Sequence, residues 1–223
     1  MSLLKKKISS SLLGKEHLFH FKNHLGSRQI FRNREMDEYL YGFDHLSNSV
    51  FDVAKMTPIL QRALNFLGRI HKANQQVLFV GTNVKSRKLI KLIAQKTNQP
   101  YVQRRWIKGL LTNWENICSS IKFYPLFLRK LDLSKKNKYK LEQTFEGVSS
   151  LKSLPSAIFL IDLKVNQEVL VEAKKLNIPI IAIVDNNSNF VHEIDYPIFS
   201  NTESVLSLFF IISLVIDIFN KKK

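Results

Sequence analysis

The sequence predicts a doubly wound α/β domain, in which helices cover a mainly parallel sheet. Four nearly continuous apolar runs, at 75–82, 157–162, 178–185 and 196–200, are typical of strands that are covered on both faces. Segments with helical periodicity alternate with these runs, and repeated strand, helix and strand units imply right-handed crossovers. The 223 residues, 45% of them hydrophobic, are enough for one such domain and an extension.

The helical segments follow in chain order. A long amphipathic helix at 52–74 leads into the first strand, and its apolar positions are Val53, Met56, Leu60, Leu64, Leu67 and Ile70. A second helix follows the first strand at 86–98, and a short strand ends near Val102. In the helix at 165–177 the apolar stripe is Val165, Val169, Leu170, Ala173 and Leu176, with Glu168, Glu172 and Lys175 on the other face. The last helix covers 202–219.

Composition suggests four parts. Residues 1–51 form a basic N-terminal extension that is polar and irregular, and we expect it to wrap the domain or a partner. Residues 52–131 and 155–223 are the two parts of the α/β domain. Between them, 132–154 is rich in lysine and serine and breaks the alternation, which indicates an inserted helical hairpin or loop.

The charge points to an anionic partner. The chain has 34 Lys and Arg against 18 Asp and Glu, a formal charge of +16, which is typical of proteins that bind nucleic acid. The single cysteine, Cys118, excludes a disulfide framework and a cysteine-based metal cluster. The six histidines show no metal-ligand spacing. The sequence therefore predicts neither a metal site nor a cofactor.

Membrane and targeting signals are weak. The most apolar run, 205–219, contains two serines and an aspartate and is shorter than the roughly twenty residues that a bilayer crossing needs. It fits a buried terminal helix better than the alternative of a peripheral membrane anchor. The first thirteen residues are basic and free of acids, which is compatible with organellar targeting.

A glycine after the first strand raises the question of a nucleotide site. Gly81 precedes a helix, where backbone N–H groups can hold a phosphate, but neither a P-loop nor GxGxxG is present. A tight strand-to-helix turn is therefore favoured over a mononucleotide site. Lys85, Arg87 and Lys88 lie near this helix start and oppose its dipole, so an anion such as a nucleic-acid backbone would relieve their repulsion.

Two aspartates end strands, where α/β enzymes often keep catalytic groups. Asp162 and Asp185 have no Ser/His partner or nucleophile elbow, and the NNSN after Asp185 resembles turn chemistry. We expect capping and turn roles for both, and no enzymatic activity.

The segment 101–114, YVQRRWIKGLLTNW, contains both tryptophans. Its donors suit phosphates and base edges, and they are Gln103, Arg104, Arg105, Lys108 and Asn113. Trp106 can either stack on a base or anchor the segment on the core. Because arginines are hard to bury, we expect an exposed basic loop.

Five ordered blocks of sequence resemble one known family. They are VLFVGT with the basic helix after it, PYVQRRWIKGLLTNW, LPSAIFLIDLKVNQEVLVEAKKLN, IPIIAIVDNNSN and IDYPIFSNTESV. Together they are similar to the S-two family of small-subunit ribosomal proteins, of bacterial and organellar type, from about Asp52 to Phe219. The resemblance implies a flavodoxin-like parallel sheet with a helical hairpin insertion and no catalysis. It also implies a place between the head and body of the small subunit, bound to ribosomal RNA and neighbouring ribosomal proteins.

The chain departs from the family pattern at four places. Lys108 replaces the first of two adjacent glycines, and the N-terminal HFGH-like signature is reduced to His24-Leu25-Gly26-Ser27. The strand-end GTK is Gly81-Thr82-Asn83, with a cation only at Lys85. The coiled-coil-like insertion is shortened to about 132–154.

The expected function is a structural constituent of a small ribosomal subunit, and the expected location is the mitochondrion, with plastid or bacterial cytoplasm as alternatives. A flavodoxin-like nucleotide- or flavin-binding protein is the competing interpretation. The predicted RNA-contacting residues lie in an N-terminal arm, the first strand-to-helix loop and the loop around Trp106. They are Lys22, Arg28, Arg32, Arg34, Lys85, Arg87, Lys88, Arg104, Arg105, Trp106, Lys108 and Asn113.

Overall fold

The protein is built around a five-stranded parallel sheet. The structure, a computed structural model, describes residues 15–130 and 145–221. The strands are β4 (Val77–Val80), β5 (Tyr101–Val102), β6 (Ala157–Ile161), β7 (Ile180–Val184) and β8 (Tyr196–Phe199). Their spatial order is β5-β4-β6-β7-β8, and all neighbours are parallel. Counted along the chain this is the flavodoxin-like order, which confirms the predicted fold class.

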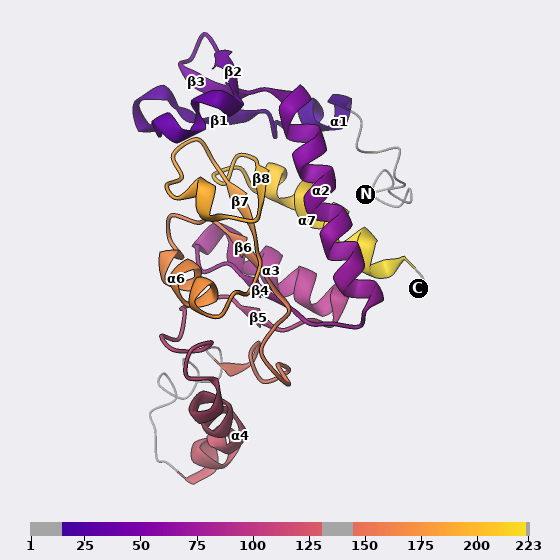
Figure 1. The fold of residues 1–223 in the computed structure, drawn as a ribbon, viewed down its shortest axis with the longest axis vertical. Helices are drawn as coiled ribbons and strands as arrows, with labels where there is room; N and C mark the ends of the chain where they lie inside the picture. Colours follow the sequence, from indigo (N-terminus) through magenta and orange to yellow (C-terminus); the bar gives the residue numbers. More distant parts are fainter. Residues whose placement is uncertain (1–14, 131–144, 222–223) are drawn as a thin grey trace.

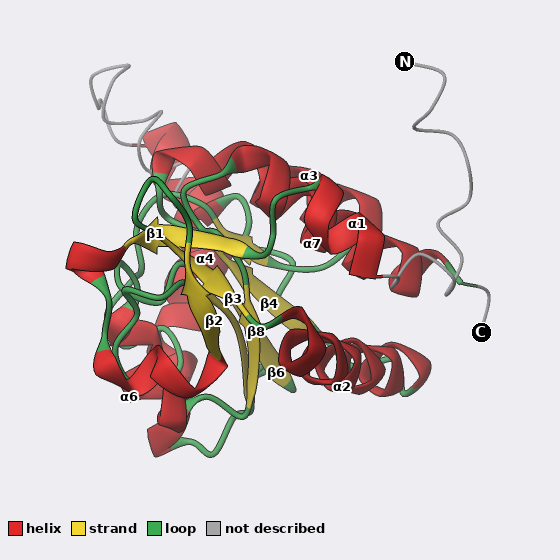
Figure 2. Cartoon of the chain, turned by 90° about the horizontal axis from the view of Figure 1, so that it is seen from above, coloured by secondary structure: helices red, strands yellow, loops and turns green. Residues whose placement is uncertain are grey.

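Helices cover both faces of the sheet. Figure 2 shows α3 (Val84–Thr97) and α7 (Val205–Asn220) on one side and α6 (Gln167–Lys175) on the other. The direction of the crossovers explains this, because β4 to β5 and β6 to β7 run toward opposite ends of the sheet and right-handed connections then place their helices on opposite faces. The long α2 (Val53–Lys72) packs against β8 and α7, and α4 (Trp114–Lys130) lies beyond the β5 end (Figure 1).

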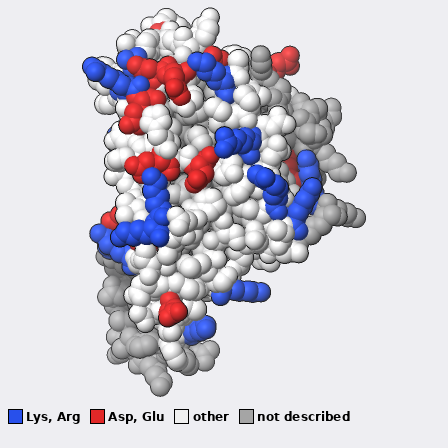
Figure 3. Space-filling view, in the orientation of Figure 1, with Lys and Arg blue, Asp and Glu red and all other residues white. Residues whose placement is uncertain are grey.

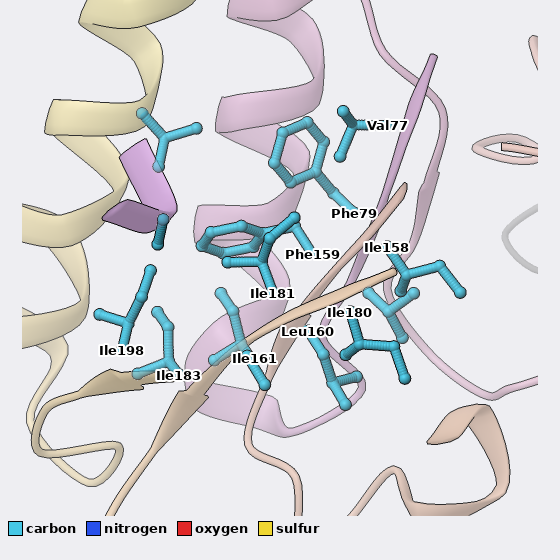
Figure 4. Packing of buried hydrophobic residues seen from close by; sticks show 14 of the residues in the cluster. Val77, Phe79, Ile158, Phe159, Leu160, Ile161, Ile180, Ile181, Ile183 and Ile198 are labelled. Atoms are coloured by element: carbon cyan, nitrogen blue, oxygen red, sulfur yellow. The ribbon is translucent and has the colours of Figure 1, made fainter. Parts of the chain in front are cut away.

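The core consists of the side chains of these strands. All residues of β4, β6 and β7 are buried, as continuous apolar runs predict. Phe79 and Phe159 project to the same side in Figure 4, with ring centroids 5.4 Å apart, and Phe79 also meets Phe219 of α7 at 6.2 Å. Ile158 and Ile180, which are partners in the register, project to the opposite face (Figure 4).

Local sequence explains where two of the helices begin. Asp52 is the N-cap of α2, and its Oδ1 accepts a hydrogen bond from the Ala54 N–H at 2.9 Å. Asn83 caps α3 in the same way through the Lys85 N–H. The same helix ends at Asn98, whose φ of 54° is the left-handed conformation common after a helix.

The N-terminal segment is more regular than the sequence suggested. It contains α1 (Lys15–His20) and a three-stranded antiparallel sheet of order β1-β3-β2. These strands are β1 (Leu25–Arg28), β2 (Leu40–Phe43) and β3 (Asn48–Phe51), with the 3-10 turns η3 (Gln29–Phe31) and η4 (Arg34–Tyr39) between β1 and β2. The expectation of an irregular segment was wrong because four-residue strands with shifted registers give only a faint alternation.

The face assigned to one acidic residue was also wrong. Glu172 of α6 is 9% exposed, whereas Val165 and Leu176, placed on the apolar stripe, are 56% and 37% exposed. Val165 and Leu176 lie outside the bounds of α6, and its stripe residues Val169, Leu170 and Ala173 are buried as predicted. The carboxylate of Glu172 faces inward beside them. The predicted insertion at 132–154 lies partly outside the described residues, so its hairpin character stays a prediction, as does the division of the chain into four parts.

Candidate nucleic-acid interface

All three predicted contact segments border the same edge of the central sheet. The turn at 81–83 follows β4 and the loop at 103–113 follows β5. The N-terminal β1 contacts Asp185 and Asn186, which follow β7. Because the carboxyl ends of parallel strands meet at one edge, segments far apart in the sequence are gathered there.

The crevice where flavodoxin-like proteins bind cofactors is filled by the chain's own side chains. This crevice lies between β4 and β6, where the strand order reverses. There the Thr82 hydroxyl donates to Asn166 Oδ1 at 2.7 Å and Asn83 Nδ2 donates to Asp162 Oδ2 at 3.0 Å. Gly81 is required by packing, since a Cβ at that position would lie 2.5 Å from Ile90 Cγ1. The turn is therefore sealed rather than open to a phosphate.

Cations line the start of α3 next to this turn. Lys85 forms an ion pair with Glu203, and Arg87 donates from Nε to the Thr82 carbonyl at 3.1 Å. Lys88 is exposed. The repulsion expected between these charges and the helix dipole is thus partly relieved within the chain, and exposed donors remain on this edge.

The basic loop at 103–113 is held by one buried carboxylate. Glu172 accepts hydrogen bonds from Trp106 Nε1 at 2.9 Å, from the Gly109 N–H at 2.7 Å and from the Leu111 N–H at 3.1 Å. Gly109 has φ of +83°, the left-handed region that favours glycine. A buried carboxylate needs several donors, and here the loop backbone supplies two of them. Glu172 therefore fixes the path of the loop on α6.

The N-terminal sheet is held by a second pair of buried polar residues. Asp185 and Asn186 are both fully buried. The Ser27 N–H donates to Asn186 Oδ1 at 2.8 Å, and the Ser27 hydroxyl donates to Asp185 Oδ2 at 2.8 Å. Asn186 Nδ2 donates in turn to the Ser27 carbonyl at 2.9 Å and to Ser49 Oγ at 2.8 Å. Burial raises the pKa of Asp185 more than the bonds from Ser27 and Asn186 lower it.

The strand-end aspartates thus serve structure, as the sequence predicted, although Asp185 does more than close a turn. A Cβ on Gly26 would lie 3.1 Å from oxygens of both Asp185 and Asn186, so β1 comes close to these side chains where a glycine stands. Asp162 adopts φ of 63° and receives the Asn83 amide. The side-chain partners of these carboxylates are the Ser27 hydroxyl for Asp185 and the Asn83 amide for Asp162, and neither partner is a histidine.

A separate hollow of about 220 Å³ lies between α2 and β8. Its polar lining includes Arg62, His192 and Asp195. The Asp195 carboxylate accepts the Ile180 N–H at 2.9 Å, and the Arg62 guanidinium stands over the Tyr196 ring at 5.4 Å. These groups are engaged in packing.

Among residues 15–130 and 145–221, no group of three His, Cys, Asp or Glu could hold a metal ion, and no helix is long and apolar enough to span a membrane.

Comparison with known proteins identifies the family. The family model described as ribosomal protein S2 matches residues 18–221. This chain belongs to the ribosomal protein S2 family. It is 32% identical to the small ribosomal subunit protein uS2 of Francisella philomiragia over 94% of this chain and 88% of that protein. It is 34% identical to the proteins of the same name from Neorickettsia sennetsu, over 91% and 72%, and from Acinetobacter baylyi, over 82% and 78%.

Within this S2-family chain, the predicted contact residues differ in exposure. Trp106 is 5% exposed and its N–H is bonded to Glu172, so of its two predicted roles the structure shows the anchor on the core. Arg105 and Lys108 are exposed, and Lys108 forms an ion pair at 2.9 Å with Glu168 in which its side chain stays 74% accessible. Asn113 is exposed and accepts a hydrogen bond from Asn116 at 2.7 Å, and Arg104 is half-buried.

The N-terminal cations are less uniform. Lys22, Arg28 and Arg34 are exposed. Arg32 is paired with Asp37 at 3.1 Å and lies over the Phe43 ring at 5.4 Å. Figure 3 shows acidic side chains gathered in the upper part of one face, over the region of β1–β3, with basic side chains beside them. Basic and acidic side chains are mixed lower on the left of the same face.

Sequence reasoning missed Glu172 as a functional residue. Its signal was the spacing of Val169, Glu172 and Ala173, which are three and four residues apart and therefore share one helix face. Val169 and Ala173 are fully buried, and Glu172 is buried with them on the same face of the helix.

Proposed function

We propose that this chain is a structural component of the small ribosomal subunit that binds ribosomal RNA and neighbouring ribosomal proteins and carries out no catalysis. Membership of the S2 family supports the assignment of the chain to the small ribosomal subunit. The observation that carries the RNA-binding role is the gathering of cationic segments along one sheet edge whose cofactor crevice is filled by Thr82, Asn83 and Asn166. A filled crevice also argues against the nucleotide- or flavin-binding alternative.

The mechanism is electrostatic and geometric. Exposed Lys and Arg neutralise phosphates of folded RNA and release counterions, while the α/β scaffold holds the loops in fixed register. The proposed contacts in the two loops are Lys85, Arg87, Lys88, Arg104, Arg105, Lys108 and Asn113, with Trp106 acting from beneath as an anchor. Lys22, Arg28, Arg32 and Arg34 stay predicted contacts. The predicted location between head and body of the subunit is part of the same proposal.

Binding to rRNA at several salt concentrations tests the role of the basic loop. The double variant Arg105→Ala and Lys108→Ala should bind small-subunit rRNA more weakly, and each lost phosphate contact should reduce the slope of log K against log salt by about 0.9. Lys96→Ala is the matched control, because this exposed lysine lies in the last turn of α3, away from the carboxyl edge. An unchanged slope in the double variant, or an equal change in Lys96→Ala, would show that the loop does not face RNA.

Co-sedimentation tests the proposed particle itself. The native chain should travel with small ribosomal subunits at low salt and dissociate steeply as salt rises, because binding dominated by phosphates weakens with ionic strength. A chain that never co-sediments with small subunits would contradict the proposal. In the same preparations, nucleotides and flavins should give no saturable thermal stabilisation of the free chain.

We infer further that the particle is a mitochondrial ribosome. The lysine-rich, acid-free stretch at 1–13 and the low glycine content, 7 residues against 16 phenylalanines, support this. The relatives named above are bacterial, so bacterial cytoplasm and plastid are the competing locations. Fusion of residues 1–24 to a soluble reporter decides, since import into isolated mitochondria is expected and exclusion of the reporter would contradict this location.

A further inference from the structure

The end of the molecule formed by the N-terminal sheet exposes large apolar side chains. Five of them define what we call the apolar tip, and they are Ile30 (86% exposed), Phe31 (62%), Tyr41 (82%), Phe43 (41%) and Leu46 (65%). They belong to η3, β2 and the turn between β2 and β3, at the upper end of the long axis in Figure 1. Single exposed apolar residues are ordinary, but a group of them at one end of the molecule marks an interaction surface.

Hydrogen bonds hold the tip in a defined shape. The Gln29 N–H donates to the Ser47 carbonyl at 2.8 Å, which ties η3 to the β2–β3 turn. Within that turn, Asp44 Oδ1 accepts the Leu46 and Asn48 N–H groups at 2.9 and 2.8 Å. The Asn48 side-chain amide, which donates to Asp44 Oδ2 at 3.0 Å, lowers the pKa of Asp44 most, and these backbone bonds lower it further. The surface is therefore preorganised, which reduces the entropy lost when a partner binds.

The charge around the tip is opposite to that of the rest of the chain. Residues 25–51 contain three cations, Arg28, Arg32 and Arg34, against the four carboxylates of Glu35, Asp37, Glu38 and Asp44, and no lysine, in a chain of net charge +16. Arg32 is already paired with Asp37 at 3.1 Å. RNA contacts of the arginines in this segment would leave the apolar side chains uncovered, because a phosphate backbone offers them no apolar partner.

We propose that the apolar tip docks a basic protein segment of a neighbouring protein in the same particle. Aromatic and aliphatic side chains would form the centre of the contact, and Glu35 and Glu38 would pair with lysines or arginines at its rim. A second copy of this chain is disfavoured as the occupant, because two bodies of charge +16 repel each other. The inference rests on the proposed function for the identity of the particle, and on the tip alone for the chemistry of the partner.

Photo-crosslinking in assembled particles tests this assignment. The full chain carries p-benzoylphenylalanine in place of Phe31 or Tyr41, which are aromatic and exposed, and is bound to small ribosomal subunits from which the natural chain was removed by high salt. The same photo-reactive residue in place of Lys108 provides the control, because a probe at that position should crosslink to RNA. We expect probes at Phe31 and Tyr41 to crosslink to a protein, at a lysine- or arginine-rich peptide identified by mass spectrometry.

The outcomes separate the two proposals. If the chain does not enter the subunit peak, the proposed function fails. If it enters the peak and probes at Phe31 and Tyr41 crosslink to rRNA, to an acidic peptide, to a second copy of this chain or to nothing, the docking inference fails alone. In the variant Glu35→Lys and Glu38→Lys, both exposed, protein crosslinking at Phe31 should fall by about tenfold while crosslinking at Lys108 is unchanged. An unaltered yield at Phe31 would overturn the charge pairing.

Discussion

The basic loop at 103–113 and the N-terminal sheet at 25–51 are both attached to the scaffold by buried polar side chains, but they present opposite chemistry outward. The loop depends on Glu172 and displays Arg105 and Lys108. The sheet depends on Asp185 and Asn186 and displays aromatic and acidic residues. The buried polar residues that attach each segment to the scaffold, here called its joint, therefore set where the surface lies. The exposed residues alone decide which partner the surface suits.

The two joints also differ in composition. Glu172 is a single carboxylate with three neutral donors, so its loss leaves all three unpaired. At the other joint, the Asn186 amide both donates and accepts, and Asp185 shares the Ser27 N–H with it. The second joint is therefore distributed over two side chains, and removal of one leaves part of it in place.

The largest expected effect comes from Glu172→Ala. Unpaired buried donors cost about 1–3 kcal/mol each, so we expect the free energy of unfolding to fall by about 3 kcal/mol or more, measured by urea denaturation with tryptophan fluorescence. Glu168→Ala on the same helix is the control, since that exposed side chain pairs only with Lys108 among the described contacts. Equal losses in the two variants would remove the special role of Glu172.

Asn186→Ala should have a smaller and more local effect. Loss of its bonds to Ser27 and Ser49 should cost about 2 kcal/mol and loosen the N-terminal sheet before the central one. Amide hydrogen exchange is the measurement, with faster exchange expected in β1 and β3 and little change in β6. Asn187→Ala is the neighbouring control. Unchanged protection of β1 and β3 would mean that Asp185 alone holds the sheet.

Asp185→Asn tests the second joint through pH. Because burial raises the folded-state pKa of Asp185 above the usual 3.8, the stability that this group contributes is complete below the unfolded pKa and is lost as pH rises through the folded pKa. The asparagine variant does not titrate, so its stability relative to the natural chain should increase as pH rises from about 4. Urea denaturation across pH checks the sign, and a relative decrease would contradict the raised pKa.

The smallest expected effect on stability is that of Lys108→Ala. Its ion pair with Glu168 is exposed on both sides, and such pairs contribute about 0–1 kcal/mol. The same variant should nonetheless weaken rRNA binding, which would separate the display of charge from the anchoring of the loop. A large loss of stability, seen in the same denaturation assay, would show that Lys108 supports the loop fold.

Most of the α/β fold could be predicted because its strands are buried on both faces. Runs such as 157–162 and 178–185 are apolar at nearly every position, so β6 and β7 were found within two residues of their observed bounds. The N-terminal strands were missed because each has only four residues, and in Leu40–Phe43 half-buried positions alternate with exposed ones, so there is no buried apolar run to recognise.

The chemistry of the site was less accessible. The loop around Trp106 was predicted as basic and exposed, and Arg105 and Lys108 are exposed whereas Arg104 is half-buried. The sequence left open whether the tryptophan stacks on RNA or on the core. Burial decides for the core. The partner of that tryptophan, Glu172, lies 66 residues away, and no local pattern connects two residues at such a separation.

The joint between Ser27 and Asp185 has a consequence for the order of events during synthesis. The two residues are 158 positions apart. At about 5–20 residues per second, a ribosome therefore needs about 8–32 s to add Asp185 after it has added Ser27. Throughout that interval β1 and β3 have no place to dock. The apolar tip can therefore take its final position only when the chain is nearly complete, which delays its exposure as a finished binding surface until the rest of the domain can fold beneath it.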